Sequence, residues 1–204
     1  DLAKIEAGKL ELERVPFSPR AALEEVVLLF AEAAESRGLE VVVHVEPDVP
    51  RRIQGDPHRF RQVLNNLLSN AIKFTEVGEV RVRLRVGARP GGGASLICDV
   101  KDTGIGIPPE AQDQLFQAFT QADSSMARRY GGTGLGLTIA LDLVVLMGGK
   151  MAFSSIPGTG SRFDFVIPLE IVEPAPGPLV DGRQGGIAVV AASAGLREAL
   201  AAQI

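Results

Sequence analysis

Residues 61–75 read RQVLNNLLSNAIKFT, and this stretch decides how the chain is interpreted. Apolar residues recur in it every three or four positions, which predicts an amphipathic helix. Asp56 followed by Pro57 is typical of a helix start, so we expect the helix to cover residues 56–75. The face predicted to pack on a sheet consists of Val63, Leu64, Leu67, Leu68, Ala71 and Ile72.

Three polar residues, Asn66, Asn70 and Lys73, follow one another in this helix at spacings of four and three. At 3.6 residues per turn they share an arc of roughly 60° beside the apolar face. An asparagine oxygen is a hard neutral ligand suited to Mg²⁺, and a lysine can neutralise phosphate oxygens. On this stretch alone, a solvated polar edge of an ordinary helix is an equally good interpretation.

Around this helix the sequence predicts alternating helices and strands. A helix is expected from Ser18, as its cap, to Arg37, with Gly38 ending it. A third helix is expected over residues 134–147. Strands are predicted over 39–47, 79–87 and 95–102, and a closing hairpin over 150–156 and 161–169. The expected fold is α/β (α+β), a two-layer sandwich with a mixed sheet covered on one face by about three helices.

A second motif, DTGIGIP at residues 102–108, directly follows a predicted strand. Gly104 and Gly106 would let the backbone turn tightly and lie against a flat ligand. The Asp102 carboxylate could accept a hydrogen bond from an exocyclic amine such as that of adenine. The alternative is a common Asp-Gly turn with no ligand.

A third motif, GGTGLGL at residues 131–137, opens the third helix. Free N–H groups at a helix start form an anion site, and glycines let phosphates approach closely. The pattern is neither GxxxxGK[ST] nor a dinucleotide fingerprint after a strand. Arg128 and Arg129 lie just before it and could contact phosphate or be solvated.

Composition narrows the function classes. The net charge of −4 does not indicate binding to nucleic acid or to an anionic membrane. Cys98 is the single cysteine and is expected to be a buried core residue. No apolar run is long enough to span a bilayer, so we expect a cytoplasmic location, whether or not the parent protein is membrane-anchored.

In order and spacing these motifs resemble the catalytic domain of sensor histidine kinases, within the superfamily of gyrase, Hsp90 and MutL ATPases. RQVLNNLLSNAIKFT resembles the family's N box, DTGIGIP and GGTGLGL its two glycine boxes, and LFQAFTQAD its phenylalanine box. PGTGSRFDFVIPL is similar to the closing hairpin. The resemblance covers roughly residues 15–170 and implies the Bergerat (GHKL) ATP-binding fold.

The resemblance implies ATP and Mg²⁺ as ligands and assigns roles to matching positions. Asn70 would hold Mg²⁺ with Asn66 beside it, and Lys73 would contact phosphate, which makes Asn66 and Lys73 the catalytic candidates. Asp102 would bind the adenine amine. Residues about 107–131 would form a lid that Phe116 and Phe119 anchor, unless these two pack only within it. The nucleotide-binding set is completed by Gly104, Gly106, Ile107, Phe119, Arg128, Arg129, Gly132, Thr133, Gly134, Leu135, Gly136, Leu137 and Thr159.

The family's chemistry would be transfer of the γ-phosphoryl group to a histidine. Hydrolysing relatives place a glutamate one turn before the metal asparagine, whereas this chain has Asn66, which cannot accept a proton. Neither His44 nor His58 lies in an acceptor motif, so the fragment is expected not to phosphorylate itself. The alternatives are a nucleotide-gated interaction module without transfer and a hydrolytic ATPase.

The expected domain division has four parts. Residues 1–14 would be the end of a dimerisation helix, 15–170 the ATP-binding domain and 171–185 a linker. Residues 186–204 have the strand-then-helix pattern that opens a receiver domain, but Ala191, Ala192 and Ser193 stand where receivers have an acidic pair. This segment is therefore either the start of a degenerate receiver or similar to one by accident. A hybrid kinase is therefore expected, with dimerisation helices and a receiver domain as partners.

Overall fold

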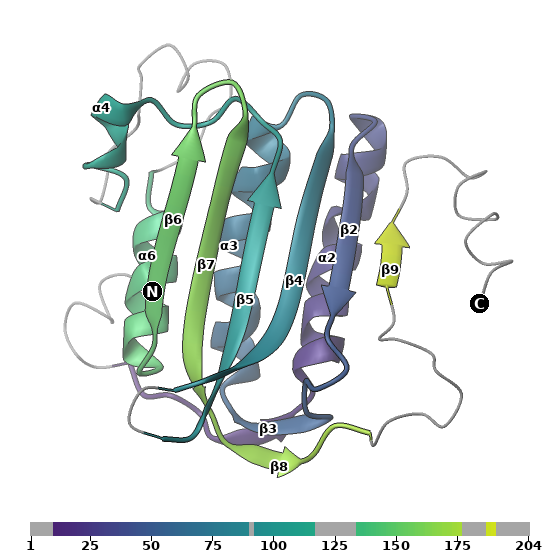
Figure 1. Cartoon of the computed structure of the whole chain (residues 1–204), viewed down its shortest axis with the longest axis vertical. Helices are drawn as coiled ribbons and strands as arrows, with labels where there is room; N and C mark the ends of the chain where they lie inside the picture. The colour runs from purple at the N-terminus through teal and green to yellow at the C-terminus, as the bar shows by residue number, and fades with distance from the viewer. Residues whose placement is uncertain (1–9, 90–91, 117–133, 177–186, 191–204) are drawn as a thin grey trace, which may run out of the picture.

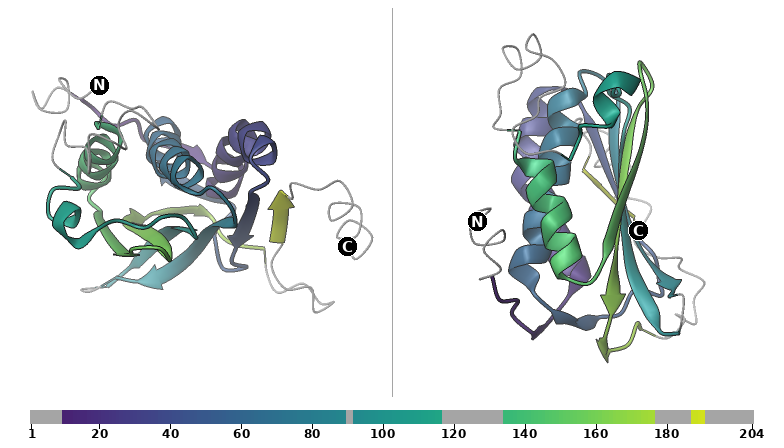
Figure 2. Two further views of the ribbon diagram at one scale, coloured as in Figure 1. Left: turned by 90° about the horizontal axis from the view of Figure 1, so that it is seen from above. Right: turned by 90° about the vertical axis from the view of Figure 1, so that its left-hand side faces the viewer.

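The computed structural model describes residues 10–89, 92–116, 134–176 and 187–190. Two layers make up the molecule, with a sheet in front and three long helices behind it (Figure 1). In the views from above and from the side, the helices cover one face of the sheet and leave the other open (Figure 2). The predicted two-layer sandwich with a one-sided helical cover is confirmed.

The main sheet has six strands in the order β6-β7-β5-β4-β2-β9. Its strands are β2 (Glu40–Val45), β4 (Glu79–Ala88), β5 (Ala94–Asp102), β6 (Lys150–Ile156), β7 (Gly160–Leu169) and β9 (Ile187–Val190). Only β2 and β4 run parallel among the described pairs; the other pairs are antiparallel. The sheet is therefore mixed, as the sequence predicts.

The covering helices are α2 (Pro19–Ser36), α3 (Pro57–Phe74) and α6 (Gly136–Leu146), with α3 in the middle (Figure 2). Ser18 caps α2 through a hydrogen bond from the Ala21 N–H, and Gly38 ends it with a φ of 67°. Asp56 caps α3 by accepting from the Arg59 N–H. These local signals explain why the predicted helix boundaries are close to those observed.

The core lies between α3 and the inward face of the sheet. All six apolar positions predicted for this face of α3 are buried, and Cys98 opposite them is fully buried, which raises the pKa of its thiol. A second sheet of three strands, β1 (Val15–Phe17), β3 (Arg52–Gly55) and β8 (Ile171–Glu173), closes one end of the core. Phe60 joins the two sheets, with ring centroids 5.6 Å from Phe17 and 6.0 Å from Phe165.

Several expectations differ from the structure. The predicted helix over residues 1–14 is wrong for residues 10–14, which are not helical; the earlier part lies outside the described residues. Leu10 is buried there, and the Glu13 N–H donates to Asp56 Oδ2, so tertiary contacts override helix propensity. A short helix, α4, covers Pro109–Gln112, and residues 113–116 after it form a turn. Strand β8 lies where only linker is expected.

The chain after the linker also forms a strand, β9, as predicted. It pairs antiparallel with the edge of β2, with Val190 opposite Val41 and Ile187 opposite His44. The residues that follow it lie outside the described part of the chain. No helix in the described ranges is both long and apolar enough to cross a membrane.

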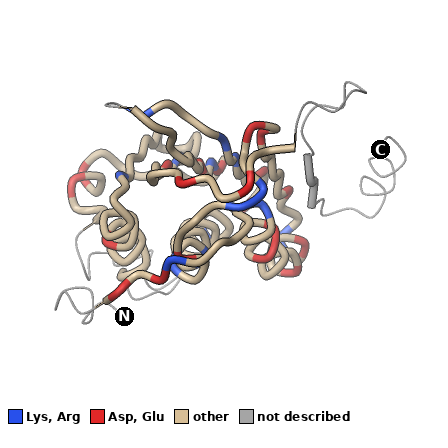
Figure 3. Tube along the Cα trace, turned by 90° about the horizontal axis from the view of Figure 1, so that it is seen from below, with Lys and Arg blue, Asp and Glu red and all other residues tan. Residues whose placement is uncertain are grey.

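Charged residues of both signs alternate along the chain trace (Figure 3). On the open face of the sheet, Arg83 pairs with Glu46, which also lies 3.1 Å from His44. Hydrogen bonding from Arg83 lowers the pKa of Glu46. His44 is thus a surface residue in an ion-pair cluster, in line with its predicted structural role.

Candidate functional site

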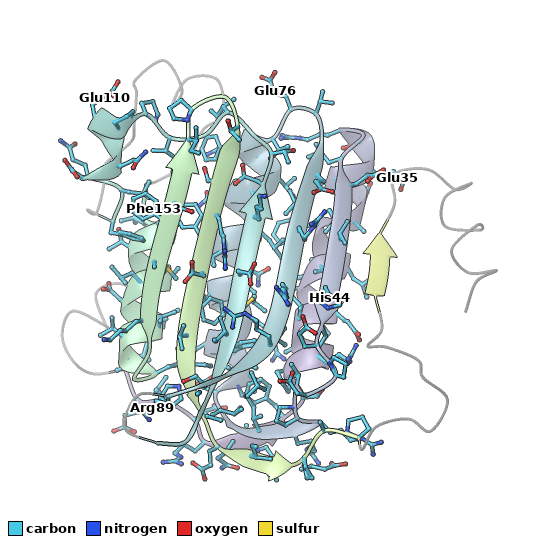
Figure 4. All side chains as sticks on the ribbon, viewed as in Figure 1. Glu35, His44, Glu76, Arg89, Glu110 and Phe153 are labelled. Atoms are coloured by element: carbon cyan, nitrogen blue, oxygen red, sulfur yellow. The ribbon has the colours of Figure 1, made fainter. Side chains whose placement is uncertain are left out.

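Three elements meet at the upper end of the molecule in Figure 1: the end of α3, the end of β5 and the turn between β6 and β7. Glu76, just after α3, and Glu110, in α4, mark this end (Figure 4). Helix α6 begins lower in Figure 1, where Gly136 lies beside Asn66 in the middle of α3. The first two sequence motifs, part of the third and the hairpin turn are therefore arranged around α3.

Asn66, the first residue of the polar arc of α3, lies beside the start of α6. Asn66, Asn70 and Lys73 are all half-buried. The Asn66 Nδ2 atom is buried and has no hydrogen-bond partner in the described part of the chain. Partial burial lowers the pKa of Lys73, whose Nζ lies 4.8 Å from the centre of the Phe74 ring. A buried amide of this kind can hydrogen-bond a ligand, and the Lys73 ammonium lies two turns further along the same helix.

Asp102 lies at the end of β5 and is only 6% exposed. Its Oδ1 atom accepts hydrogen bonds from the N–H groups of Gly104 (2.9 Å) and Ser161 (3.1 Å). Burial raises the pKa of Asp102, and these two hydrogen bonds oppose that effect. The Asp-Gly turn that the sequence allows is therefore present, but it uses Oδ1 alone and leaves Oδ2 as a possible acceptor for a ligand.

The glycines of DTGIGIP let this loop pass between α3 and the hairpin. A Cβ on Gly104 would lie 2.2 Å from the Phe74 carbonyl oxygen, and one on Gly106, at φ 69°, would lie 2.2 Å from that of Ile156. The Ile105 N–H donates to the Phe74 oxygen, which fixes the loop on the end of α3. Thr159 is exposed in the hairpin turn, where its N–H donates to the Ile156 oxygen.

Helix α6 begins with backbone N–H groups that no side chain caps. Gly134 precedes it at φ 69°, and Leu135 occupies the N-cap position. A Cβ on Gly136 would lie 3.5 Å from Asn66 Oδ1, so the first turn of α6 directly faces the polar arc of α3. Leu137 packs against the core and orients this turn. Uncapped N–H groups facing polar side chains can bind an anion.

Part of the predicted site lies outside the described residues: Phe119, Arg128, Arg129, Gly132 and Thr133. Phe116 is described and packs edge-to-face on Phe153 at 5.7 Å. The Thr138 hydroxyl donates to the Phe116 carbonyl oxygen, which connects the start of the predicted lid to α6.

Sequence reasoning missed Ser155, a half-buried residue of β6. Its Oγ accepts from the Ile107 N–H (2.8 Å), donates to the Gly160 carbonyl oxygen (3.1 Å) and lies 2.9 Å from Ser161 Oγ. Ser155 thereby holds the end of the DTGIGIP loop close to Ser161, whose N–H donates to Asp102. The inward-facing position of a serine in an alternating strand is the only sequence signal for it.

We expect Ser155→Ala to lower the free energy of unfolding by about 1 kcal/mol, because the Ile107 N–H loses its acceptor. Urea denaturation would measure this. The matched control is Ser154→Ala on the exposed face of the same strand, which should change stability by less than about 0.5 kcal/mol. Equal effects of both changes would show that the Ser155 hydrogen bonds do not stabilise the fold.

A surface depression of about 450 Å³ lies at the opposite end of β2 and β4 and offers a second candidate site. Its lining consists of Glu46, Pro47, Asp48, Arg83, Arg85 and Val86. Arg83 and Glu46 already neutralise each other there, and the lining has no glycine backbone for a phosphate. Within the described residues, no cluster of His, Cys, Asp and Glu could hold a metal.

Comparisons with known proteins identify the family. Residues 55–171 match the family model described as "Histidine kinase-, DNA gyrase B-, and HSP90-like ATPase". The chain is 47% identical over 171 residues to the signal transduction histidine-protein kinase BarA of Escherichia coli K12, covering 84% of this chain and 19% of BarA. It is 47% identical over 163 residues to the sensor protein GacS of Pseudomonas syringae, covering 80% and 18%.

Solved structures show the same fold. Full-length ShkA in complex with AMPPNP superposes with a TM-score of 0.72 at 34% identity, covering 84% of this chain and 34% of ShkA. The catalytic domain of histidine kinase ThkA gives a TM-score of 0.60 at 26% identity, covering 76% and 95%. The chain spans about a fifth of the length of the curated relatives it matches. It belongs to the histidine kinase-, gyrase B- and HSP90-like ATPase family, and its relatives within it are sensor histidine kinases.

Proposed function

We propose that this chain binds Mg-ATP and presents the γ-phosphate to a histidine on the dimerisation helices of its parent kinase. The observation that carries the proposal is the presence of two polar features on elements that pack around α3. One is the Asp102 carboxylate, whose Oδ1 accepts two hydrogen bonds and whose Oδ2 is left for a ligand. The other is the uncapped start of α6, which lies beside the unpartnered amide of Asn66. The Asp102 carboxylate suits the amine of a nucleotide base, and the start of α6 suits a phosphate group.

The residues fit each part of such a ligand. Asp102 Oδ2 would accept from the adenine amine, with Gly104 and Gly106 beneath the ring. Lys73 and the first N–H groups of α6, from Gly136 onward, would neutralise phosphate oxygens. Asn70 would hold Mg²⁺ through its oxygen, with Asn66 beside it; the ion would neutralise charge that develops on the phosphates.

Transfer would break the bond between the γ-phosphorus and its bridging oxygen and form a phosphorus–nitrogen bond to the histidine, with ADP leaving. This reaction depends mainly on positioning and on charge neutralisation. Asn66 offers no base for a water molecule, because a carboxamide does not take up a proton near neutral pH. This favours transfer over hydrolysis.

The test is label transfer from γ-labelled ATP to a separately produced dimerisation-helix dimer. We expect acid-labile label on the helices and none on this chain alone. Asn70→Ala should reduce Mg-dependent transfer by about 100-fold, whereas Asn65→Ala, on the outer face of the same helix, should leave it unchanged. Tight binding without transfer would indicate a nucleotide-gated interaction module, and steady phosphate release would indicate an ATPase.

A location in the cytoplasm and contact with a receiver domain belong to the same proposal. Both depend on parts of the parent protein outside this chain. If they hold, strand β9, which pairs with β2 of the main sheet, is the first strand of the receiver-like segment. Adding an isolated receiver domain to the labelled helices should then remove the label from them.

A further inference from the structure

The C-terminal end of α3 lacks the backbone device that ends α2. Helix α2 ends with Gly38 in the left-handed region, and the N–H groups of Arg37, Gly38 and Leu39 return to the carbonyls of its last turn. At α3 the capping residue Thr75 is extended, with φ −106° and ψ 117°, and fully buried. The last carbonyls of α3 therefore need partners from outside the helix.

Three different parts of the chain supply these partners. The Thr75 hydroxyl donates to the Ala71 oxygen at 2.7 Å. The Ile105 N–H, from the loop beside Asp102, donates to the Phe74 oxygen at 3.2 Å. Between them, Nη1 of Arg37 donates to the Ile72 oxygen at 2.9 Å and to the Lys73 oxygen at 3.3 Å.

Arg37 is well placed to do this. It is the capping residue of α2, so its backbone is fixed by the turn at Gly38. A guanidinium at the C-terminal end of a helix also interacts favourably with the helix dipole. Its side chain crosses from α2 to α3, where Nη1 donates to two backbone oxygens of the last turn of α3. These bonds hold the position of this turn and do not involve its side chains.

The turn that Arg37 caps carries the groups on which the proposed function depends. It includes Lys73, begins beside Asn70 and ends at Phe74, which receives the glycine loop. We propose that Arg37 is a positioning residue for nucleotide binding: by capping α3 it keeps the proposed metal and phosphate groups in register with the loop at Asp102. This inference rests on the proposed function.

Calorimetry with AMPPNP tests it on the full chain, with and without Mg²⁺. The measured quantity is the ratio of the Kd without Mg²⁺ to the Kd with Mg²⁺. Arg37→Ala should lower this ratio by about fivefold, which is in the range for residues that act without touching the ligand. Arg37→Lys, which keeps one charged donor, should recover part of it.

The matched control is Arg61→Ala. Arg61 also joins α3 to α2, through Glu25 at 3.2 Å, but near the start of α3 and away from Asn70. It should leave the ratio within twofold of the wild type. If Arg37 has a purely structural role, both changes will lower the melting temperature and leave both Kd ratios unaltered, and this result would overturn the inference. An equal fall in the Kd ratio for Arg37→Ala and Arg61→Ala would also overturn it.

Two further outcomes decide the inference. If Arg37→Ala does not fold, Arg37→Lys carries the test, and a ratio equal to that of the wild type overturns it. If the unmodified chain shows no Mg-dependent binding at all, the proposed function fails and this inference fails with it. Wild-type binding with an unchanged Arg37→Ala ratio overturns the inference alone.

Discussion

Replacing Asp102 by asparagine is expected to weaken ATP binding by about 100-fold while leaving the fold at least as stable. An asparagine can keep the two hydrogen bonds from Gly104 and Ser161 through its single oxygen. Its amide nitrogen then takes the place of Oδ2 and presents donors to the adenine amine, itself a donor. Losing a hydrogen bond to a charged acceptor costs about 1.5–3 kcal/mol, and each 1.4 kcal/mol is tenfold in affinity.

Stability should not fall, because burial makes the charged form of Asp102 unfavourable. Its folded-state pKa is raised above the unfolded value of about 3.9. The native state therefore binds more protons than the unfolded state between these two pKa values, and the stability contributed by this group falls as pH rises through that window. As the pH rises through this window the wild type takes on the cost of the buried charge, which Asp102→Asn does not carry.

Replacing adenine by another nucleotide base shows whether Asp102 contacts the base itself. Inosine triphosphate carries a carbonyl oxygen where ATP carries the amine, so Asp102→Asn should shift the preference from ATP toward inosine triphosphate. Asp99→Asn is the matched control, because Asp99 lies on the same strand but faces the other side, 3.7 Å from Arg162. Wild-type preference in Asp102→Asn would mean that the carboxylate does not contact the base.

The sequence predicts α3 and its polar arc well because the signals are local. Apolar spacing, the Asp56 cap and the proline behind it all lie within the helix itself. The partner of Asp102 in β7, Ser161, is 59 residues away in sequence, and nothing local to either residue indicates the contact. A site residue can thus be predicted from its motif, whereas the hydrogen bonds that orient it cannot.

The short strands of the second sheet escape prediction for a different reason. Strands β3 and β8 have four and three residues, too few for an alternating pattern, and they form because each supplies hydrogen bonds to the other. The same applies to residues 10–14, where burial of Leu10 and the bond from Glu13 to Asp56 replace the helix that their composition favours. In both places non-local contacts outweigh propensity.

Two glycine substitutions should separate the stability of the site from its ability to bind phosphate. In Gly104→Ala the new Cβ would lie 2.2 Å from the Phe74 carbonyl oxygen, and a backbone atom cannot move aside as a side chain can. Overpacking of this kind costs about 1–3 kcal/mol or more. We expect the melting temperature to fall by roughly 5–10 °C, since each kcal/mol corresponds to about 2–4 °C in a chain of this size.

In Gly136→Ala the Cβ would meet Asn66 Oδ1 at 3.5 Å, an ordinary contact, and alanine is a better helix former than glycine. The fold should therefore survive with an unchanged or higher melting temperature. The methyl group would nevertheless stand between the start of α6 and the polar arc of α3, where the phosphates are proposed to lie. ATP affinity should fall by at least about tenfold, or 1.4 kcal/mol. Because Gly136→Ala keeps the fold, unaltered ATP affinity in this variant would mean that the phosphates bind elsewhere. In Gly104→Ala, an unaltered melting temperature would mean that the loop is not packed on the end of α3.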